Sequence, residues 1–432
     1  MKRVVGIHER LPIAETIPLS LQHLMAMFGA TVLVPYLVGI NPAICLLMNG
    51  IGTILYTIVT KGGIPAYLGS SFAFIAPILA IAPFAAGTDT PPNANFPLAQ
   101  VGFIFFGIFF VIMALIIKKF GTRWIDIVMP PAVMGAVVAV IGLELAPVAA
   151  QQAGLTGTPD GKVIAVSLIT LLVTVIGSVV FRGFAQIIPV LIGVVVGYIA
   201  ALFLGMVDFS GVAGAGIVGL PRATVPAIHW QSIIVIAPAC LVVLAEHISH
   251  LIVTGKVTDS DLVNEPGLYR SLLGDGLSNI LSGFFGSTPN TTYGENIGVM
   301  AITRIYSVWV IRGAAIIAIL FSLIPKFSAF IQSIPVPVMG GVCIYLYGVI
   351  AAVGIRMLVE KRVNLGRNYN LALCAIVFSV GVSGATIHIG TVALSGMALS
   401  AVTGVVLSLA FYIFGKFGLM NEEYDPTEQL ED

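Results

Sequence analysis

Residues 16–60 read TIPLSLQHLMAMFGATVLVPYLVGINPAICLLMNGIGTILYTIVT, a mostly apolar stretch that contains no Asp, Glu, Lys or Arg. Residues 368–415 form a second long run without these charged residues. A transmembrane helix needs about 20 apolar residues, so each run is about two spans long. Each run therefore predicts a helical hairpin inside a lipid bilayer.

The composition agrees with a protein that has lipid as its main solvent. Of the 432 residues, 58% are hydrophobic and only 9% are charged, which is too few charges for the mixed surface of a soluble domain. The formal net charge is zero and no basic run occurs. Nucleic-acid-binding proteins carry clusters of basic residues that contact phosphates, and this sequence has no such run, so RNA and DNA are excluded as partners.

The four cysteines are Cys45, Cys240, Cys343 and Cys374. They lie far apart in apolar segments, with no Cys-x-x-Cys motif and no histidine at metal-ligand spacing. We expect them to pack as small buried hydrophobic residues, and we expect neither a metal nor a cofactor.

Apolar stretches alternate with short polar segments along the chain, and this pattern predicts fourteen transmembrane segments. The fold class is therefore an all-α polytopic membrane protein. The predicted segments lie near residues 16–37, 42–60, 66–84, 98–117, 127–147, 163–181, 184–206, 230–253, 270–285, 291–306, 308–325, 334–355, 369–386 and 393–415.

The basic residues test this count, because cytoplasmic loops carry an excess of Lys and Arg. An even number of segments places both termini on one side, and 16 of the 20 basic residues fall on that side. They are Lys2, Arg3, Arg10, Lys61, Lys118, Lys119, Arg123, Arg182, Lys256, Arg270, Arg304, Arg356, Lys361, Arg362, Arg367 and Lys416. The sequence therefore predicts a multi-pass protein of the cytoplasmic (inner) membrane with both termini in the cytoplasm.

The two ends of the chain fit this orientation. The apolar segment that follows Met-Lys-Arg is too long for a signal peptide and has no Ala-x-Ala cleavage site, so we expect a retained N-terminus. Residues 419–432 are rich in acidic residues and are expected to form a solvated cytoplasmic tail.

Three short motifs recur in the second half of the chain. MPPAVMGAV at residues 129–137 resembles IPVPVMGGV at 334–342, Gln22-His23 resembles Glu246-His247, and LGSS at 68–71 resembles FGST at 285–288. The pairs keep the same order, and the copies in each pair are seven predicted segments apart, an odd number. The copies then cross the membrane in opposite directions, which predicts a 7+7 inverted repeat, an architecture typical of secondary transporters.

The third and tenth predicted segments are the least helix-like, and they correspond to each other in the two halves. Gly-Ser-Ser at 69–71 interrupts the third, and GSTPNTTYG at 286–294 interrupts the tenth. Broken backbone at membrane depth exposes N–H and C=O groups that only a cavity can use, so the pair indicates a binding site. Two re-entrant loops without a ligand are the alternative.

Two acidic residues stand beside these features. Glu246 and His250 are four residues apart and share a helix face, whereas His247 points elsewhere. A charged carboxylate at the bilayer centre costs about 2.5–3.5 kcal/mol, so Glu246 should face the bundle interior, where a proton carrier needs an acid. Glu295 follows the break in the tenth segment, where a half-helix should begin and its free N–H groups can orient a carboxylate. A structural Glu–His pair and a simple helix cap remain the alternatives.

The chain resembles the nucleobase-ascorbate transporter family, and within it the bacterial uracil permeases, along nearly its whole length. The resemblance rests on IPLSLQHL at 17–24, IPAYLGSSFAF at 64–74, the run from Ala245 to His247 with His250 beyond it, and GSTPNTTYGENIG at 286–298. The last stretch continues to Thr303-Arg304, which completes the family pattern Asn-x-Gly followed by Thr-Arg.

The resemblance implies a division into two domains of interleaved sequence. A core domain would comprise segments 1–4 (residues 1–120) and 8–11 (230–330), and a gate domain segments 5–7 (121–229) and 12–14 (331–418). Short strands are implied in segments 3 and 10, with the substrate between them.

The resemblance also assigns roles to individual residues. Glu246 and Glu295 would bind the base through their side chains, and Phe72 and Gly294 through backbone groups. His250 would assist Glu246 in proton coupling, and Tyr347 would be a gate-side residue near the site. Related xanthine and urate carriers often have Gln where Glu295 stands, so Glu favours uracil.

The expected function is therefore import of uracil by proton symport, with the proton as the coupling ion. Uracil presents alternating N–H and C=O groups, and a protonated carboxyl can both donate to and accept from such an edge. Carriers of another nucleobase and, less favoured because of the two acids, anion exchangers of the same architecture are the alternatives. No nucleophile with a paired base, metal cluster or phosphate loop occurs, which disfavours an enzyme. The expected partners are the nucleobase and the lipid bilayer; a homodimer is left open.

Overall fold

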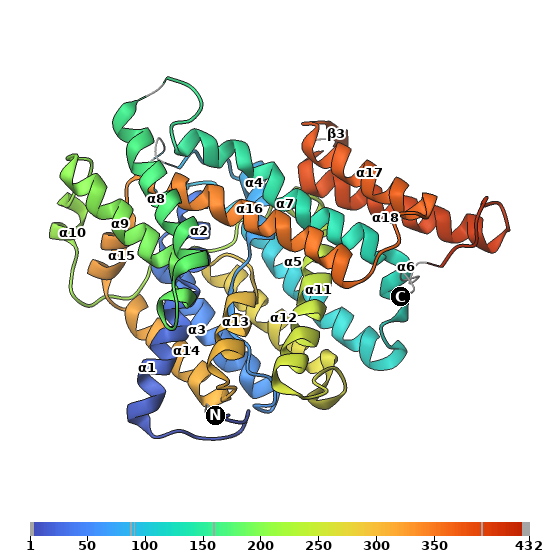
Figure 1. Ribbon diagram of the computed structural model, residues 1–432, viewed down its shortest axis with the longest axis horizontal. Coiled ribbons are helices and arrows are strands. Elements are labelled where there is room, and N and C mark those ends of the chain that lie inside the picture. Colours follow the sequence, from blue (N-terminus) through green and yellow to red (C-terminus); the bar gives the residue numbers. More distant parts are fainter. Residues whose placement is uncertain (1–3, 87–88, 90, 159, 390–391, 426–432) are drawn as a thin grey trace.

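The computed structural model describes residues 4–86, 89, 91–158, 160–389 and 392–425, and the fold is built mainly from helices (Figure 1). Lys2, Arg3 and residues 426–432 of the predicted tail lie outside the described residues. The first half contains α1 (Ile13–Ala26), α2 (Phe28–Val38), α3 (Pro42–Val59), β1 (Leu68–Ser70), the 3₁₀ turn η1 (Phe72–Phe74), α4 (Ile75–Ile81), α5 (Phe96–Phe120), α6 (Arg123–Val128), α7 (Pro131–Gln152), α8 (Gly161–Val180), η2 (Ala185–Ile187), α9 (Pro189–Phe203) and α10 (Ser210–Gly214). The second half contains α11 (Gln231–Thr258), the turn η3 (Val263–Gly267), α12 (Leu268–Phe285), β2 (Asn290–Thr292), α13 (Gly294–Thr303), α14 (Val308–Ser322), α15 (Pro325–Gln332), α16 (Val336–Glu360), α17 (Asn368–Val382), β3 (Thr386–Ile389), β4 (Val392–Ser395) and α18 (Gly396–Lys416).

Many of these helices have the length and composition of membrane spans. Within the described part of the chain, α3, α5, α7, α8, α11, α16 and α18 are long and apolar enough to cross a membrane, which makes seven. The number rises to nine if the bent pairs α1–α2 (43°) and α14–α15 (86°) each count as one span. The structure thus agrees with a polytopic helical protein, while the count of fourteen and the inverted repeat stay predictions.

The two predicted strands are present. The third predicted segment folds as β1, η1 and α4, and the tenth folds as β2 followed by α13. β1 and β2 pair antiparallel, with Gly69 opposite Thr291 and Ser70 opposite Asn290. Pairing gives each strand partners for its backbone groups inside the bundle, which is the condition for irregular backbone at membrane depth.

The helices pack as two groups. α1, α3, α5, α11, α12 and α14 pack on one another and enclose β1 and β2, whereas α7, α8, α9, α16, α17 and α18 form the second group. The groups meet where α11 contacts α18 and α7, and where α2 contacts α9. In Figure 1 the C-terminal pair α17 and α18 lies beside α7 and α16, away from α1 and α14.

Helices α7 and α16 begin with the two copies of the MPPAVMGAV-like motif, and they pack closely along their length. Glycines permit this approach. A Cβ on Gly354 of α16 would overlap the backbone of Ala139 and Gly135 of α7, and a Cβ on Gly142 would overlap that of Tyr347 and Ala351. Small residues that let two backbones approach are typical of helix packing in membranes.

Replacing Gly354 by Val should therefore force α7 and α16 apart. Overpacking of this kind costs about 1–3 kcal/mol, so the thermal midpoint of the detergent-solubilised protein should fall clearly. Gly348 on the same helix serves as the control, because a Cβ placed there would meet no atom within 4 Å. Equal melting temperatures for Gly354→Val and Gly348→Val would contradict the close packing.

A hairpin occupies the connection between α17 and α18. β3 and β4 pair antiparallel, with Thr386 opposite Ser395 and His388 opposite Ala393. The predicted helical segments 369–386 and 393–415 are therefore wrong at these two ends. β-branched residues such as Thr386 and Ile387 favour a strand over a helix here.

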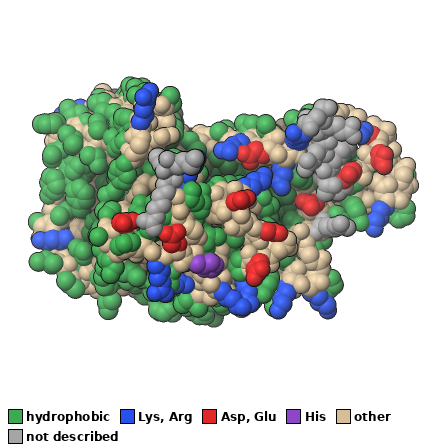
Figure 2. All heavy atoms as spheres, turned by 60° about the horizontal axis from the view of Figure 1, so that its bottom comes forward, with side chains coloured by type: hydrophobic (Ala, Val, Ile, Leu, Met, Phe, Trp, Pro, Cys, Tyr) green, Lys and Arg blue, Asp and Glu red, His purple; other side chains and the backbone are tan. Residues whose placement is uncertain are grey.

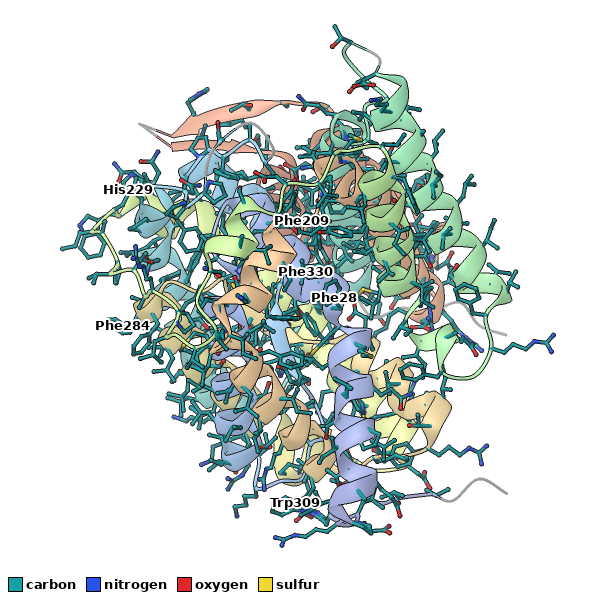
Figure 3. The ribbon with its side chains drawn as sticks, turned by 90° about the vertical axis from the view of Figure 1, so that its left-hand side faces the viewer. Phe28, Phe209, His229, Phe284, Trp309 and Phe330 are labelled. Carbon is teal, nitrogen blue, oxygen red and sulfur yellow. The ribbon has the colours of Figure 1, made fainter. Side chains whose placement is uncertain are left out.

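The first described residues are held against the second half of the chain. The backbone N–H of Val5 donates to the carbonyl of Arg304 (3.0 Å), and the N–H of Tyr306 donates to the carbonyl of Val5 (2.9 Å). At the same end of the molecule, the guanidinium of Arg10 lies 3.8 Å from the ring centroid of Trp309, which is labelled at the bottom of Figure 3. The N-terminal segment is thus anchored to α14 and to the end of α13.

Candidate functional site

The site is built around the ends of the two short strands. β1 leads into η1, where Ser71 Oγ accepts a hydrogen bond from the N–H of Ala73 (3.4 Å). β2 leads into α13, whose N-cap residue Tyr293 makes no side-chain capping bond. Because the first N–H groups of a helix have no partner within it, the start of α13 offers donors and the positive end of a helix dipole.

Helix α11 brings Glu246 and His250 to these strand ends. His250 Nδ1 lies 3.1 Å from Thr292 Oγ1, the last residue of β2. A Cβ placed on Gly294 would be 3.2 Å from His250 Nε2, so the imidazole lies directly against the start of α13. Glu246 is half-buried and lies within electrostatic reach of Glu295.

The two carboxyl groups remain available for a ligand. Glu246 makes no hydrogen bond to any residue that the structure describes, and Glu295 is exposed in the first turn of α13. Glu295 is not the N-cap residue, because α13 begins one residue earlier, at Gly294. The structure therefore brings together the predicted residues Glu246, His250, Gly294 and Glu295.

The second helix group contributes an aromatic wall. The ring of Phe72, at the start of η1, lies 6.5 Å from that of Tyr347 on α16, at an interplanar angle of 86°. Tyr347 is 1% exposed, and its hydroxyl has no hydrogen-bond partner among the described residues. The predicted gate-side residue thus lies against the predicted backbone-binding residue, where the two helix groups meet.

A fully buried network of polar side chains connects the elements that carry the site. His247 Nδ1 lies 2.9 Å from Asp275 Oδ2, and both side chains are fully buried. His247 Nε2 is 2.7 Å from Ser271 Oγ, which is in turn 2.7 Å from the hydroxyl of Tyr56. The prediction that His247 points away from the Glu246 face is confirmed, and its partner is Asp275 on α12.

The same network reaches β2. Asn279 Nδ2 donates to Asp275 Oδ1 (2.9 Å), and Asn279 Oδ1 accepts the backbone N–H of Asn290 (2.6 Å). The amide of Asn290 donates to Ser278 Oγ (3.0 Å). One carboxylate therefore connects the helix that carries Glu246 to the strand that precedes Gly294, and such a network positions both sides of the site.

A second buried link joins α1 to α13. Asn296 Nδ2 lies 2.9 Å from Nδ1 of His23, and both residues are buried. The sequence singled out His23 only through a repeated motif and the family resemblance, and Asn296 only through the family pattern. Their hydrogen bond fixes the first turn of α13, next to Glu295.

The cysteines are packed as the sequence predicts. Cys45, Cys240, Cys343 and Cys374 are all buried and free, as predicted for packing residues. In the described ranges, no group of three or more His, Cys, Asp or Glu side chains is arranged to hold a metal ion. The arrangement offers two carboxyls, an imidazole, a helix N-terminus and an aromatic wall, which suit a small polar ring rather than a metal.

Residues 14–390 match the family model described as "Permease family" (Xan_ur_permease). The chain belongs to this permease family. It is therefore a multi-pass membrane transporter, in agreement with its spans. The prediction from the family resemblance is confirmed at the level of the family.

Curated relatives cover nearly the whole chain. A uracil permease of Paenibacillus larvae subsp. larvae is 55% identical over 427 residues, which are 97% of this chain and 99% of the relative. A uracil permease of Escherichia coli strain K12 is also 55% identical, over 414 residues, which are 95% of this chain and 94% of the relative.

Solved structures show the same fold at low sequence identity. The transmembrane domain of the cyanobacterial bicarbonate transporter BicA has a TM-score of 0.61 and 13% identity, covering 94% of this chain and 100% of that one. SLC26A9 has a TM-score of 0.70 and 12% identity, covering 93% of this chain and 65% of that one. At such identities the likeness shows the fold alone.

Proposed function

We propose that this permease imports uracil by proton symport, through alternating access between a core and a gate domain. The observation that carries the proposal is the placement of Glu246 and Glu295, on different helices, on either side of the strand ends. The uracil permeases that are 55% identical over nearly the full length support uracil as the substrate.

The chemistry of the site fits a neutral pyrimidine. The edge of uracil alternates N–H and C=O groups, and a carboxyl that carries a proton can donate to a carbonyl while it accepts from the adjacent N–H. An ionised carboxylate can only accept. Phe72 and Tyr347 provide aromatic surface next to these groups for the flat face of the ring.

Proton symport follows if proton occupancy and base affinity are linked at Glu246. Linkage is reciprocal, so a proton that favours base binding is itself held more tightly when the base is bound. His250 lies one helical turn from Glu246 and within hydrogen-bond distance of Thr292 in β2, and in this proposal it would tune the Glu246 carboxyl rather than hold the base.

The two helix groups support the proposed domains. The first group would form the core, from residues 1–120 and 230–330, and the second the gate, from residues 121–229 and 331–418. Because their contacts run mainly through α11, relative movement of the groups would open the site to either side in turn.

The orientation that we propose places both termini in the cytoplasm and the protein in the inner membrane. Figure 2 shows Lys and Arg side chains gathered along the lower edge of the molecule, with hydrophobic side chains covering its left flank. An excess of basic side chains at one edge of the molecule is the distribution expected for the cytoplasmic side.

Uptake into proteoliposomes tests the function. Radiolabelled uracil should accumulate when an inward proton gradient is imposed and should only equilibrate without one. Competition by a panel of unlabelled bases separates uracil from xanthine and other nucleobases. Accumulation of bicarbonate or sulfate in place of uracil would favour transport of an anion, as in the bicarbonate transporter BicA.

Replacing Glu295 by Gln should weaken uracil binding while the protein stays folded. A hydrogen bond to a charged or protonatable carboxyl is worth about 1.5–3 kcal/mol, so we expect at least about a tenfold loss of affinity or a shift toward other bases. Equilibrium binding to the purified protein measures it. Glu360→Gln, at an exposed residue on α16, is the control, and unchanged affinity in Glu295→Gln would remove Glu295 from the site.

Backbone recognition at Phe72 and Gly294 predicts an ordered pair of effects. Gly294→Val should abolish most transport, because its side chain would press on His250, which a Cβ would already approach to 3.2 Å. Phe72→Ala should be milder, since it removes only ring contacts and leaves the backbone groups in place. Initial rates of uracil uptake at equal expression give the comparison; the opposite order would refute backbone recognition.

A further inference from the structure

A cavity lies between the two helix groups, beside the site rather than in it. It has a volume of about 150 Å³ and is lined by residues of α6, the first turn of α7, the middle of α11 and the end of α16. That volume is room for several water molecules or for one single-ring solute. In Figure 1, α7 and α16 cross diagonally above α11, and all three helices contribute residues to the lining of the cavity.

The cavity and the site share helix α11 but use neighbouring stripes of it. Ala245 and Ser249 line the cavity, whereas Glu246 and His250, each the next residue along, face the strand ends. Successive residues of an α-helix are about 100° apart around the axis, at a rise of about 1.5 Å. A solute that leaves the site would therefore reach the cavity by moving a short way around α11.

The lining has the chemistry of a site for a neutral, flat, polar-edged molecule. Ile248, Met134 and Met357 supply apolar walls, and Ser249 supplies a hydroxyl. Such a mixture of apolar walls with a few convergent polar groups is typical of small-molecule sites.

The lining of the cavity carries one charge of each sign. Asp126 of α6 and Lys361, which follows α16, both line it. Burial raises the pKa of Asp126, and the neighbouring positive charge of Lys361 acts in the opposite direction. Opposite charges in one lining produce no net attraction for an anion or a cation, which suits a neutral solute.

We propose that this cavity is a second, transit binding site for the same class of neutral single-ring base, on the cytoplasmic side of the Glu246–Glu295 site. The proposal rests on the proposed function and on the proposed orientation. The base would leave the first site, lie between Ile248 and Met134 with an edge at Ser249, and then pass Asp126 and Lys361.

Filling the cavity tests the proposal. Ser249→Phe should lower proton-driven uracil uptake in proteoliposomes by about tenfold or more, while equilibrium binding of uracil to the purified variant stays within about threefold of the parent. Ser178→Phe on α8 is the matched control, because Ser178 bonds only within its own helix, to Val175, and does not line the cavity. It should retain both uptake and binding.

A second variant covers the case in which Ser249→Phe does not fold. Ser249→Cys keeps a small side chain, and the four native cysteines are buried, so a bulky maleimide should react mainly at the new thiol of the folded protein. Labelling should abolish uptake and spare uracil binding, and saturating uracil should slow the labelling.

The outcomes separate the two proposals. If uptake is undiminished after the cavity is filled or labelled, the transit site is overturned while the proposed function stands. If uracil binding is lost in parallel with uptake, the cavity belongs to the first site, and the transit site is again overturned. A parent protein that neither binds nor accumulates uracil overturns the proposed function and the transit site with it.

Discussion

Replacing Glu246 by Gln should abolish proton-driven accumulation of uracil while uracil binding persists. Gln imitates the protonated acid, since it keeps one donor and one acceptor, but it cannot release a proton. Net accumulation against a gradient should then collapse to equilibration. Uptake of uracil and of protons, measured together in proteoliposomes, tests the loss of coupling, and equilibrium binding to the purified protein tests whether binding persists.

Comparison with His250→Ala sharpens this test. The imidazole contacts Thr292 and the start of α13, so its loss should reduce coupling only in part, whereas Glu246→Gln should abolish it, and both variants should still bind uracil. Glu360→Gln, far from the strand ends on the exposed end of α16, should behave like the parent. A Glu246→Gln protein that still accumulates uracil against its gradient would place the coupling proton elsewhere.

Replacing Asp275 by Asn should have the largest effect on stability. Its carboxylate faces His247 on one side and Asn279 on the other, and all three side chains are fully buried. Loss of one partner leaves a buried polar group without its contact, which typically costs about 1–3 kcal/mol, and more where the group is charged. The thermal midpoint in detergent should fall by many degrees, and transport should be lost with it.

Asp259→Asn is the control for Asp275→Asn. Asp259 is exposed at the C-terminal end of α11 with a φ of 52°, a left-handed conformation that Asn also tolerates. This variant should melt and transport like the parent. If Asp275→Asn matches it in both melting temperature and uptake, the network does not hold α11 and β2 together.

The breaks in the third and tenth segments can be predicted from the sequence because they carry local signals, whereas strands there are implied only by the family resemblance. Clusters of Gly, Ser, Thr and Pro in two otherwise apolar segments disfavour a continuous helix, and the spacing of Glu246 and His250 places them on one face. Both kinds of signal depend on neighbours within a few residues. The structure accordingly agrees on β1, β2 and the start of α13.

The supporting network lacks such a signal. Periodicity indicates which residues share a face of α12, but not that Asp275 and Asn279 meet His247 and β2. That pairing depends on how α11 and α12 pack, which is a tertiary property. From the sequence alone, Asp275 is therefore only a weak candidate for a stabilising residue in the core.

Helix ends are also hard to place from the sequence. The change from apolar to charged residues marks where the chain leaves the lipid, but the helix itself can continue into water. α16 continues to Glu360, beyond the predicted end at 355, and its last turns carry an exposed pair between Arg356 and Glu360 (2.7 Å). Charged residues stop a membrane segment without stopping a helix. The β3–β4 hairpin is not predicted because no charged residue interrupts this stretch, and an uncharged apolar run favours a helix throughout.

The pairing of β1 with β2 has a consequence for biosynthesis. Leu68 is opposite Thr292, so β1 enters the membrane long before the ribosome has made its partner. Until then its N–H and C=O groups lack the hydrogen bonds that hydrocarbon requires, which disfavours stable insertion of that segment. The third segment must therefore wait at the translocon or near the interface. A chain released before residue 290 contains a third segment whose strand is unpaired, and such a segment is a natural target for membrane proteases.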